Sequence, residues 1–596
     1  MAQNVIFQNI SQMTPWRNKY LRARGIFEVE NVNFHHGDIR PYRCPHKICD
    51  LDRNYRSIHP LPKCGCHGYN DGRKLVRGFG RDQYFYVDGG RLRQATERQI
   101  CDREDVLAGS PVPVQAPEVS GPACDGDVCD GVVVSYVFTY LTRLGNNGAL
   151  VEGSPSPPSD PIVTRANSPG VTVSWEGIPE RYANYPIVGV RLYRTEADYS
   201  DVQPTVQSSE WLLVEEWFAS DDLDVAGAMS YKDEFETSRT KYPLLTYDPM
   251  IFPAPGDLVA ATRTTDGIVV ADERRIYISV NGQPMFTWDG VVEVEQKIIW
   301  LESIGNTIYV FTEKNPINIS YSVRGKTFSI EKTVIDRNLP VSSLRSISNY
   351  RGRIIFASEY SLYAWSTDRY GDNIVSVLNP FISPEQWKNL DPDTIVGTQY
   401  EYGYIFSSDA IDYSIILEIN DDGVDTQIGS NIMKFTYIKN PMSFGLDYEG
   451  NIVYCENREL WRWNFRRTPC YNDDFEIFEH VRPLGCGQCG CCQWSIKFFI
   501  DNEGKNHFSH MRVEWDERSA PNLWVSFHIH EFGREIFHTE EMEIISSRGF
   551  GLPFKNVGYQ SCYVHLRGCG IVHQIKVATS AQELVYNSNN GVVGDE

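Results

Sequence analysis

The stretch Gly352–Ser366 reads GRIIFASEYSLYAWS, and it decides how the rest of the chain is interpreted. An apolar run is followed by a short polar connection and then by a second apolar run that carries aromatic residues. This order predicts a β-hairpin. In an isolated hairpin, the Tyr and Trp side chains would suggest a surface that binds sugars. In one copy of a repeat, packing between neighbouring copies explains the same side chains.

Four other segments share this order of turn residue, strand, polar connection and second strand. They begin at Gly267, Asn306, Gly403 and Gly450, and with Gly352 included the successive starts lie 39, 46, 51 and 47 residues apart. A period in the forties with paired strands in every copy is typical of propeller blades. Each blade buries its two apolar faces only by packing on its neighbours. The alternative is an irregular β-sandwich with similar hairpins, and five copies in order favour the propeller.

The length of 596 residues predicts several domains, because a single core stops growing well below that size. The predicted fold class is all-β, a β-propeller with two further modules. The assigned ranges are 1–131 for an N-terminal segment with the first propeller strands and a Pro/Gly-rich linker, 132–235 for an inserted fibronectin type III-like sandwich, 236–485 for the main blades, 486–586 for a C-terminal β-sandwich, and 587–596 for a mobile tail.

Composition supports strands over helices. Aromatic residues make up 12% of the chain, and 46 Gly with 32 Pro supply many turns. The clearest helix pattern is Ser383–Leu390, SPEQWKNL, with Ser as N-cap and Pro at the first helical position. No window resembles a transmembrane helix, and the N-terminus does not resemble a signal peptide, so we expect synthesis in a cytoplasm.

The formal net charge of −22 argues against a surface that grips nucleic acid, because such a surface needs clustered Lys and Arg. An acidic wall could still let nucleic acid pass without sticking, since it repels phosphate. Solubility alone is the simpler explanation of the charge.

The fifteen cysteines are clustered, which suggests structural metal sites or disulfides. One cluster contains a CxxC half-knuckle, and a terminal pair could supply its missing ligands. A second cluster lies near the N-terminus. Structural zinc, disulfides and free thiols are the three alternatives, and none of them implies catalysis. The candidate residues are Cys486, Cys489, Cys491, Cys492, Cys562 and Cys569 in the first cluster, and Cys44, His46, Cys49, Cys64, Cys66 and His67 in the second.

No catalytic motif is recognisable, so we expect a protein that is not an enzyme and has no certain cofactor beyond a possible structural zinc. The chain contains no GxxxxGK[ST], GxSxG or HExxH pattern. His528 and His530 alternate along a predicted strand and could share a metal, although core or surface histidines at this spacing are more common.

Several segments, in order, resemble the nozzle proteins of short-tailed phages, also called tail tubular protein B. They include NVNFHHGDIRPYRCP, then SYVFTYLTRLGNNGALVEGSPSPPS, then PAPGDLVAATRTTDGIVVADERRIYISVNGQPMFTW, in which Ser279, Pro284 and Trp288 match a typical close of the family's repeat. Later blade segments and the terminal strands WSIKFFI and VATSAQELVYN continue the order, so the resemblance covers most of the chain. The cysteine clusters are not part of this pattern.

The resemblance implies a homo-hexameric ring in the virion tail, assembled in the host cytoplasm. The ring would close the DNA-ejection channel until infection, bind the tail adaptor above it and tail fibres or other tail proteins at its side, and face the host envelope. Genomic DNA would pass without specific binding, which leads us to expect more carboxylates than basic residues on the channel surface. The DNA-channel and gating residues are unknown.

Two other classes of function remain open from the sequence. One is a receptor- or glycan-binding propeller on a virion surface, which would carry a polar, aromatic-rich pocket. The other is a glycan-cleaving tail enzyme, which would need two carboxylates facing one pocket. The blade interpretation makes Phe356 a buried packing residue, and we expect its replacement by Ala to cost about 3–5 kcal/mol.

Overall fold

The computed structural model forms two compact units, and each is described by itself. Unit 1 comprises Met1–Pro60, Gly68–Gly72 and Val341–Glu596, and unit 2 comprises Leu61–His67 and Arg73–Pro340. The residues that the structure describes are 5–7, 26–33, 39–42, 45–61, 65–70, 74–79, 82–121, 131–144, 148–165, 170–198, 211–219, 227–234, 251–279, 282–324, 327–335, 338–367, 373–378, 382–420, 429–464, 493–501, 509–516, 521–531, 534–553 and 561–578.

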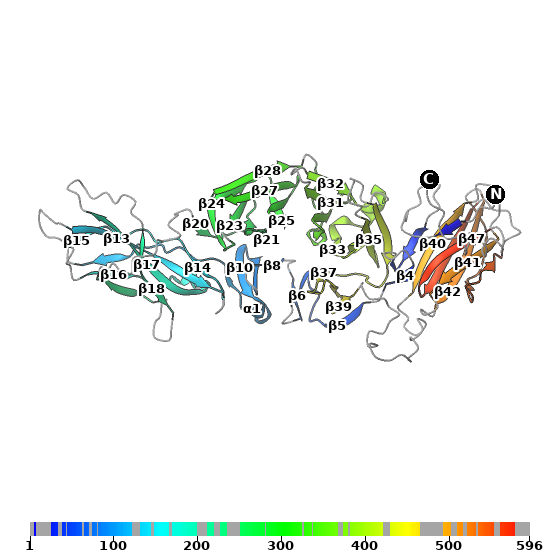
Figure 1. Cartoon of the computed structure of the whole chain (residues 1–596), viewed down its shortest axis with the longest axis horizontal. Helices are drawn as coiled ribbons and strands as arrows, with labels where there is room; N and C mark the ends of the chain where they lie inside the picture. The colour runs from blue at the N-terminus through cyan, green and yellow to red at the C-terminus, as the bar shows by residue number, and fades with distance from the viewer. Residues whose placement is uncertain are drawn as a thin grey trace. The chain divides into compact units, whose positions relative to one another are not determined.

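Unit 2 contains three successive antiparallel sheets with the form of propeller blades (Figure 1). The first has the order β11-β10-β9-β8, the second β20-β24-β23-β22-β21, and the third β25-β26-β27-β28. The strands are β8 (Val76–Arg77), β9 (Gln83–Asp88), β10 (Arg91–Thr96), β11 (Val106–Leu107), β20 (Ile251–Pro253), β21 (Ala260–Arg263), β22 (Ile268–Ala271), β23 (Arg275–Ser279), β24 (Met285–Glu293), β25 (Ile298–Ile304), β26 (Thr307–Thr312), β27 (Ile317–Arg324) and β28 (Thr327–Val334).

Unit 1 contains three more sheets of the same form. Their orders are β29-β30-β31-β32, β33-β34-β35-β36 and β37-β38-β39-β5, so a strand from near the N-terminus completes the last sheet. The strands are β29 (Ser348–Tyr350), β30 (Arg353–Ala357), β31 (Leu362–Thr367), β32 (Asn373–Val377), β33 (Val396–Tyr400), β34 (Gly403–Ser407), β35 (Ser414–Asn420), β36 (Gly429–Phe435), β37 (Ser443–Leu446), β38 (Ile452–Glu456), β39 (Glu459–Trp463) and β5 (His46–Asp50).

The five sequence repeats each correspond to the two middle strands of one sheet. The repeat at Gly352 forms the antiparallel pair β30 and β31. Gly352 itself has a φ of 78°, which an L side chain rarely adopts. The hairpin at Asp82–Ala95 forms β9 and β10 of a sixth sheet. The all-β fold class with blade-like sheets is therefore confirmed.

Apolar side chains bury the faces of neighbouring sheets within each unit. In unit 1, Ile355 and Ala357 of β30 pack with Tyr404 and Phe406 of β34. In unit 2, the second sheet packs on the first around Phe85 and on the third around Ile308. This face-to-face burial is the packing that propeller blades require.

The inserted module is a β-sandwich, as expected for a fibronectin type III-like domain. A sheet of order β12-β16-β19 packs on one of order β14-β13-β17-β18, with β15 beside β13. Its strands are β12 (Glu118–Ser120), β13 (Gly131–Arg143), β14 (Leu150–Glu152), β15 (Ile162–Arg165), β16 (Val171–Trp175), β17 (Ile187–Asp198), β18 (Leu212–Phe218) and β19 (Met229–Asp233). A buried ion pair of 2.5 Å between Arg194 of β17 and Asp233 of β19 joins the two sheets.

The segment GSPSPPS, residues 153–159, covers the edge of β13 between β14 and β15. Ser156 and Ser159 use their hydroxyl oxygens to accept the N–H groups of Phe138 and Tyr136, at 3.1 and 2.9 Å. The three-residue spacing of the contacts is that of a polyproline II ribbon. Every third N–H of the run also donates to β13, from Gly153 to Tyr140, from Ser156 to Phe138 and from Ser159 to Tyr136.

The C-terminal sandwich takes two of its strands from the N-terminal region. One sheet has the order β1-β47-β41-β45, and the other contains β2-β40-β46-β42-β43 with β44 beside β42. The range 1–131 thus contributes strands to the blades, to the inserted sandwich (β12) and to the C-terminal sandwich. The strands are β1 (Val5–Phe7), β2 (Ile26–Glu30), β40 (Trp494–Asp501), β41 (His510–Trp515), β42 (Asn522–Glu531), β43 (Arg534–His538), β44 (Met542–Glu543), β45 (Phe550–Gly551), β46 (Ser561–Cys569) and β47 (Val572–Ala578).

The remaining elements are short. Two pairs of strands form two-stranded sheets: β3 (Val32–Asn33) with β4 (Arg40–Pro41), and β6 (Ser57–Leu61) with β7 (Gly65–Tyr69). In the described part of the chain, the α-helices are α1 (Glu97–Asp102) and α2 (Pro384–Asn389), and there are three short 3-10 helices, Glu180–Tyr182, Leu344–Ser346 and Pro392–Thr394. Helix α2 confirms the predicted helix with Ser383 as its N-cap. Among the described residues, no helix has the length and hydropathy needed to cross a membrane.

Candidate functional site

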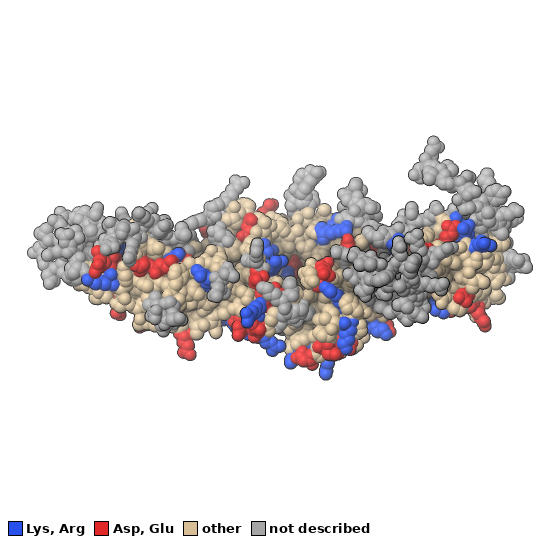
Figure 2. Space-filling view, turned by 60° about the horizontal axis from the view of Figure 1, so that its bottom comes forward, with Lys and Arg blue, Asp and Glu red and all other residues tan. Residues whose placement is uncertain are grey.

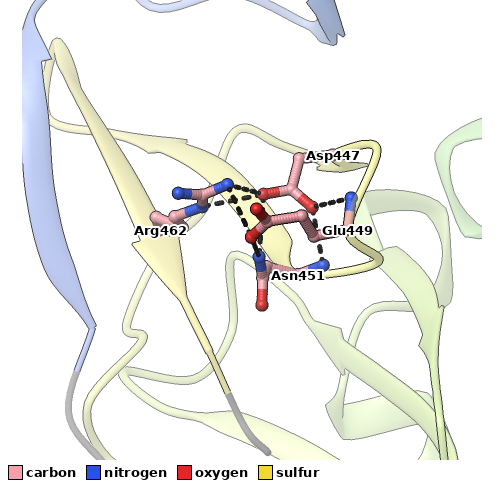
Figure 3. A network of polar contacts seen from close by, with 4 residues as sticks. All are labelled: Asp447, Glu449, Asn451 and Arg462. Atoms are coloured by element: carbon pink, nitrogen blue, oxygen red, sulfur yellow. Dashed lines mark hydrogen bonds and ion pairs between the residues drawn. The ribbon is translucent and has the colours of Figure 1, made fainter. Parts of the chain in front are cut away.

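A network of polar contacts lies at the turn between β37 and β38 (Figure 3). Asp447 is almost fully buried there, and its Oδ1 accepts the backbone N–H groups of Glu449 and Asn451 at 2.9 and 2.8 Å. Its Oδ2 accepts the Asn451 side-chain amide at 2.9 Å and Nε of Arg462, from β39, at 2.7 Å. The carboxylate thereby holds a turn and a neighbouring strand together.

The acidic side chains of this cluster are compensated by a basic side chain of the same cluster. Burial acts to raise the pKa of Asp447, but hydrogen bonds from Asn451 and Arg462 outweigh it and leave that pKa below its ordinary value. The Arg462 guanidinium also lies 3.4 Å from the Glu449 carboxylate. Because Arg462 already supplies the positive charge between the two acidic side chains, the cluster acts as a structural clamp for the hairpin.

Equivalent turns of neighbouring sheets are bonded to one another. In unit 2, the Asn306 side chain donates to Asp266 at 2.6 Å, and the Thr265 N–H donates to the carbonyl of Gly305 at 3.0 Å. In unit 1, Arg351 donates to the carbonyl of Glu401 at 3.1 Å. These contacts align the turn of each sheet with the equivalent turn of the next, so the polar turns position neighbouring sheets relative to one another.

Trp288, one of the residues that match the nozzle-protein pattern, is exposed at the surface. It is 55% exposed, on a bulge of β24 where Tyr277 pairs with Val291 but Ser279 pairs with Phe286. Its ring lies 4.8 Å from that of Phe252. Bulges re-aim side chains at a sheet edge, and this one directs a large aromatic ring to the surface. By contrast, the hydroxyl of Ser279 accepts the N–H of Ile268 at 2.8 Å inside the sheet.

The described cysteines are spread over several elements and do not gather into a compact metal site. Cys562 and Cys569 are buried on β46, and burial raises the pKa of Cys562 to about 12, which disfavours the thiolate that binds zinc. Cys49 is an exposed free thiol on β5. Cys101 of α1, which belonged to no predicted cluster, takes part in a disulfide. The side chains of Cys44, Cys64, Cys66, His67, Cys486, Cys489, Cys491 and Cys492 lie outside the described residues.

The histidines of the C-terminal sandwich pair across two strands. His528 of β42 is directly opposite His538 of β43, with the ring centroids 6.1 Å apart, and each ring has its Nδ1 within 3.4 Å of the Glu535 carboxylate. The side chain of His530, the other predicted ligand, lies outside the described residues, and His46 lies on β5. Among side chains that the structure describes, no group of three or more has the arrangement of a metal site.

The described surface mixes charges of both signs. Figure 2 shows Lys and Arg beside Asp and Glu on the face in view rather than a field of one sign. Around β5, for example, Lys47 bridges Asp50 and Glu459 at 2.7 and 2.6 Å. Exposed pairs of this kind contribute little to stability.

Comparisons with known proteins identify no family for the chain. No protein-family model and no curated protein matches it. Among solved structures, Hsv2 from Kluyveromyces lactis overlaps with a TM-score of 0.22 at 8% identity, covering 44% of this chain and 69% of that one. The CNH domain of AfRom2 overlaps with a TM-score of 0.23 at 10% identity, covering 56% and 88%. Overlaps this loose carry no argument about function.

Proposed function

We propose that this chain is a non-catalytic structural subunit of a short phage tail, in which six copies form the distal nozzle ring around the DNA-ejection channel. The ordered sequence motifs supply the resemblance to nozzle proteins. The structural observation that supports it is the ten-stranded sheet of unit 1, in which β36 of a blade bonds to β2 and β2 bonds to β40 of the C-terminal sandwich. Strand pairing thus links blade and sandwich, through the Glu30–Lys434 pair on the β36 side and a longer register on the β40 side, and such a link suits a wall that must resist pressure.

In this proposal, the tail adaptor binds above the ring, and fibres or other tail proteins bind at its side. Genomic DNA passes through a channel whose surface carries more carboxylates than basic residues. The net charge of −22 is compatible with such a surface, because fixed negative charge repels phosphate.

The mass and symmetry of the purified full-length protein test the proposal. We expect a six-fold ring with a central channel about as wide as duplex DNA, seen by mass photometry and by electron microscopy of single particles, either alone or with the adaptor. A protein that remains monomeric or trimeric with its tail partners would contradict the nozzle function. A ring with a basic channel surface would contradict the sliding mechanism but leave the ring assembly standing.

The second candidate is a receptor- or glycan-binding module on a virion surface, and the exposed Trp288 favours it. Exposed aromatic rings are frequent anchors in binding sites, and Trp288 is supported from one side by Phe252. Binding to immobilised glycans that is lost in Trp288→Ala and retained in Tyr360→Ala, another exposed aromatic residue, would support this candidate. Equal binding by both variants would contradict it.

A further inference from the structure

The N-terminal strand β2 is the only hydrogen-bonded strand between the blade β33–β36 and the C-terminal sandwich sheet in the described order. It pairs in parallel with β36, where Glu30 is opposite Lys434, and antiparallel with β40, where Val29 is opposite Ile496. If β2 left this position, the continuous sheet would separate into two sheets with open edges at β36 and β40.

The end of β2 is fixed by one residue, Asn31. Its side-chain Nδ2 donates to the hydroxyl of Thr436 at 2.8 Å, and its Oδ1 accepts the N–H of Thr436, also at 2.8 Å. The Asn31 backbone N–H donates to the carbonyl of Lys434 at 2.9 Å. Asn31 is 4% exposed and Thr436 is half-buried.

The backbone at Asn31 explains why asparagine suits this position. Its φ of 56° lies in the left-handed region, which asparagine tolerates better than most L residues. The chain bends there, and the N–H of Tyr42, just after β4, donates to the Asn31 carbonyl at 3.1 Å. Tyr42 then lies in the core of unit 1, with its ring edge-on to Phe435 of β36. The same residue thus ends β2, bonds the blade and fixes the returning segment.

We propose that the Asn31–Thr436 pair is a latch that holds β2 between blade and sandwich, and that β2 can undock as a local unit without unfolding of either sheet. Such local openings have lower free energies than global unfolding, and they follow the boundaries of supersecondary elements. The inference concerns unit 1 alone and does not depend on whether the chain forms a ring.

Hydrogen–deuterium exchange of the full-length protein, followed by mass spectrometry of overlapping peptides, tests the latch. Asn31→Ala removes both side-chain bonds, and Thr436→Val removes only the hydroxyl at nearly constant volume. We expect the peptides that contain β2, Thr436 and the β2-facing part of β40 to exchange on the order of 10-fold faster or more in Asn31→Ala, and by a smaller factor in Thr436→Val. Peptides of β34 and β46 should keep their wild-type rates.

A matched control is Asn373→Ala, which removes a half-buried acceptor of the Trp365 indole N–H in another sheet of unit 1. It should speed exchange around β31 and β32 and leave β2 unchanged. Unchanged exchange of β2 in both latch variants, or equal acceleration of β34 and β46, would overturn the proposal. If Asn31→Ala does not fold, Thr436→Val decides. Where both fold, strictly additive effects in the double variant would show that the two residues do not act as a pair.

Discussion

Phe356 of β30 offers the sharpest test of the blade interpretation. The side chain is fully buried, and its ring is stacked on Tyr363 of the next strand with a centroid distance of 5.8 Å. A fully buried phenylalanine removes roughly 150–250 Å² of surface from water. At about 25 cal/mol per Å², this burial corresponds to about 4–6 kcal/mol, of which alanine retains a minor share.

We therefore expect Phe356→Ala to lower the free energy of unfolding by about 3–5 kcal/mol, in the range of core Phe to Ala changes. Loss of the aromatic pair with Tyr363 accounts for about 0.5–1.5 kcal/mol of this cost. Urea unfolding followed by fluorescence and by circular dichroism gives the free-energy difference. Near-coincidence of the two probes would support the use of a single transition.

The control is Tyr360→Ala, because Tyr360 lies in the connection between the same two strands but is 54% exposed. It should cost less than about 0.5 kcal/mol, as exposed substitutions usually do. A near-neutral Phe356→Ala, or equal costs for the two variants, would refute the assignment of these aromatic residues to packing. The hairpin would then again be a candidate binding surface.

Three further predictions follow from individual contacts. Asp447→Asn should flatten the dependence of unfolding free energy on pH at the acid end. A carboxyl with a lowered pKa contributes stability that is full above its unfolded pKa of about 4 and is lost as pH falls through its folded value. Parallel pH curves for variant and wild type would argue against the clamp with Arg462. Ser156→Ala and Ser159→Ala should each cost about 1–3 kcal/mol in thermal or urea unfolding, because each leaves a buried N–H of β13 without its hydroxyl acceptor, and a cost below about 0.5 kcal/mol would contradict the ribbon. Iodoacetamide labelling of the native protein, read out by peptide mass, should modify the exposed Cys49 and spare the buried Cys562, and equal rates would contradict the burial that raises the pKa of Cys562.

The middle strands of the blades could be predicted from the sequence because their pattern is local. In the repeat at Gly352, a turn glycine is followed by apolar strand residues that are buried on both faces, and the signal returns at each blade. The outer strands carry a weaker signal. All five residues of β5 are exposed, so no apolar alternation marks it, and its His46 and Cys49 suggested a metal cluster instead. Only its pairing with β39 identifies β5 as part of a blade.

Some of the polar contacts could have been predicted from the sequence. Asp447 lies three residues before Gly450, and an Asp followed at that spacing by Gly-Asn is a turn signal just before the start of the repeat at Gly450. Arg462 and Asn31 were not predictable, because their partners are fixed by strand pairing across sheets. The exposure of Trp288 depends on a bulge, which the spacing of residues in one strand does not reveal.

The two units differ in how far apart in the sequence their paired strands lie. In unit 2, the blade strands pair with the strand before or after them in the chain, except β20, which pairs with β24. In unit 1, β1 pairs with β47 and β5 pairs with β39, so the module is complete only when both ends of the chain are present. Pairing over such distances closes long loops and forms slowly.

A chain emerging from the ribosome can therefore order unit 2, with its inserted sandwich, first, whereas the N-terminal strands must wait for β36, β39, β40 and β47. The resulting interlock means that truncation at either end opens edges in the same C-terminal sandwich, and Asn31, which fixes the strand shared by sandwich and blade, lies where the two ends of the chain are joined.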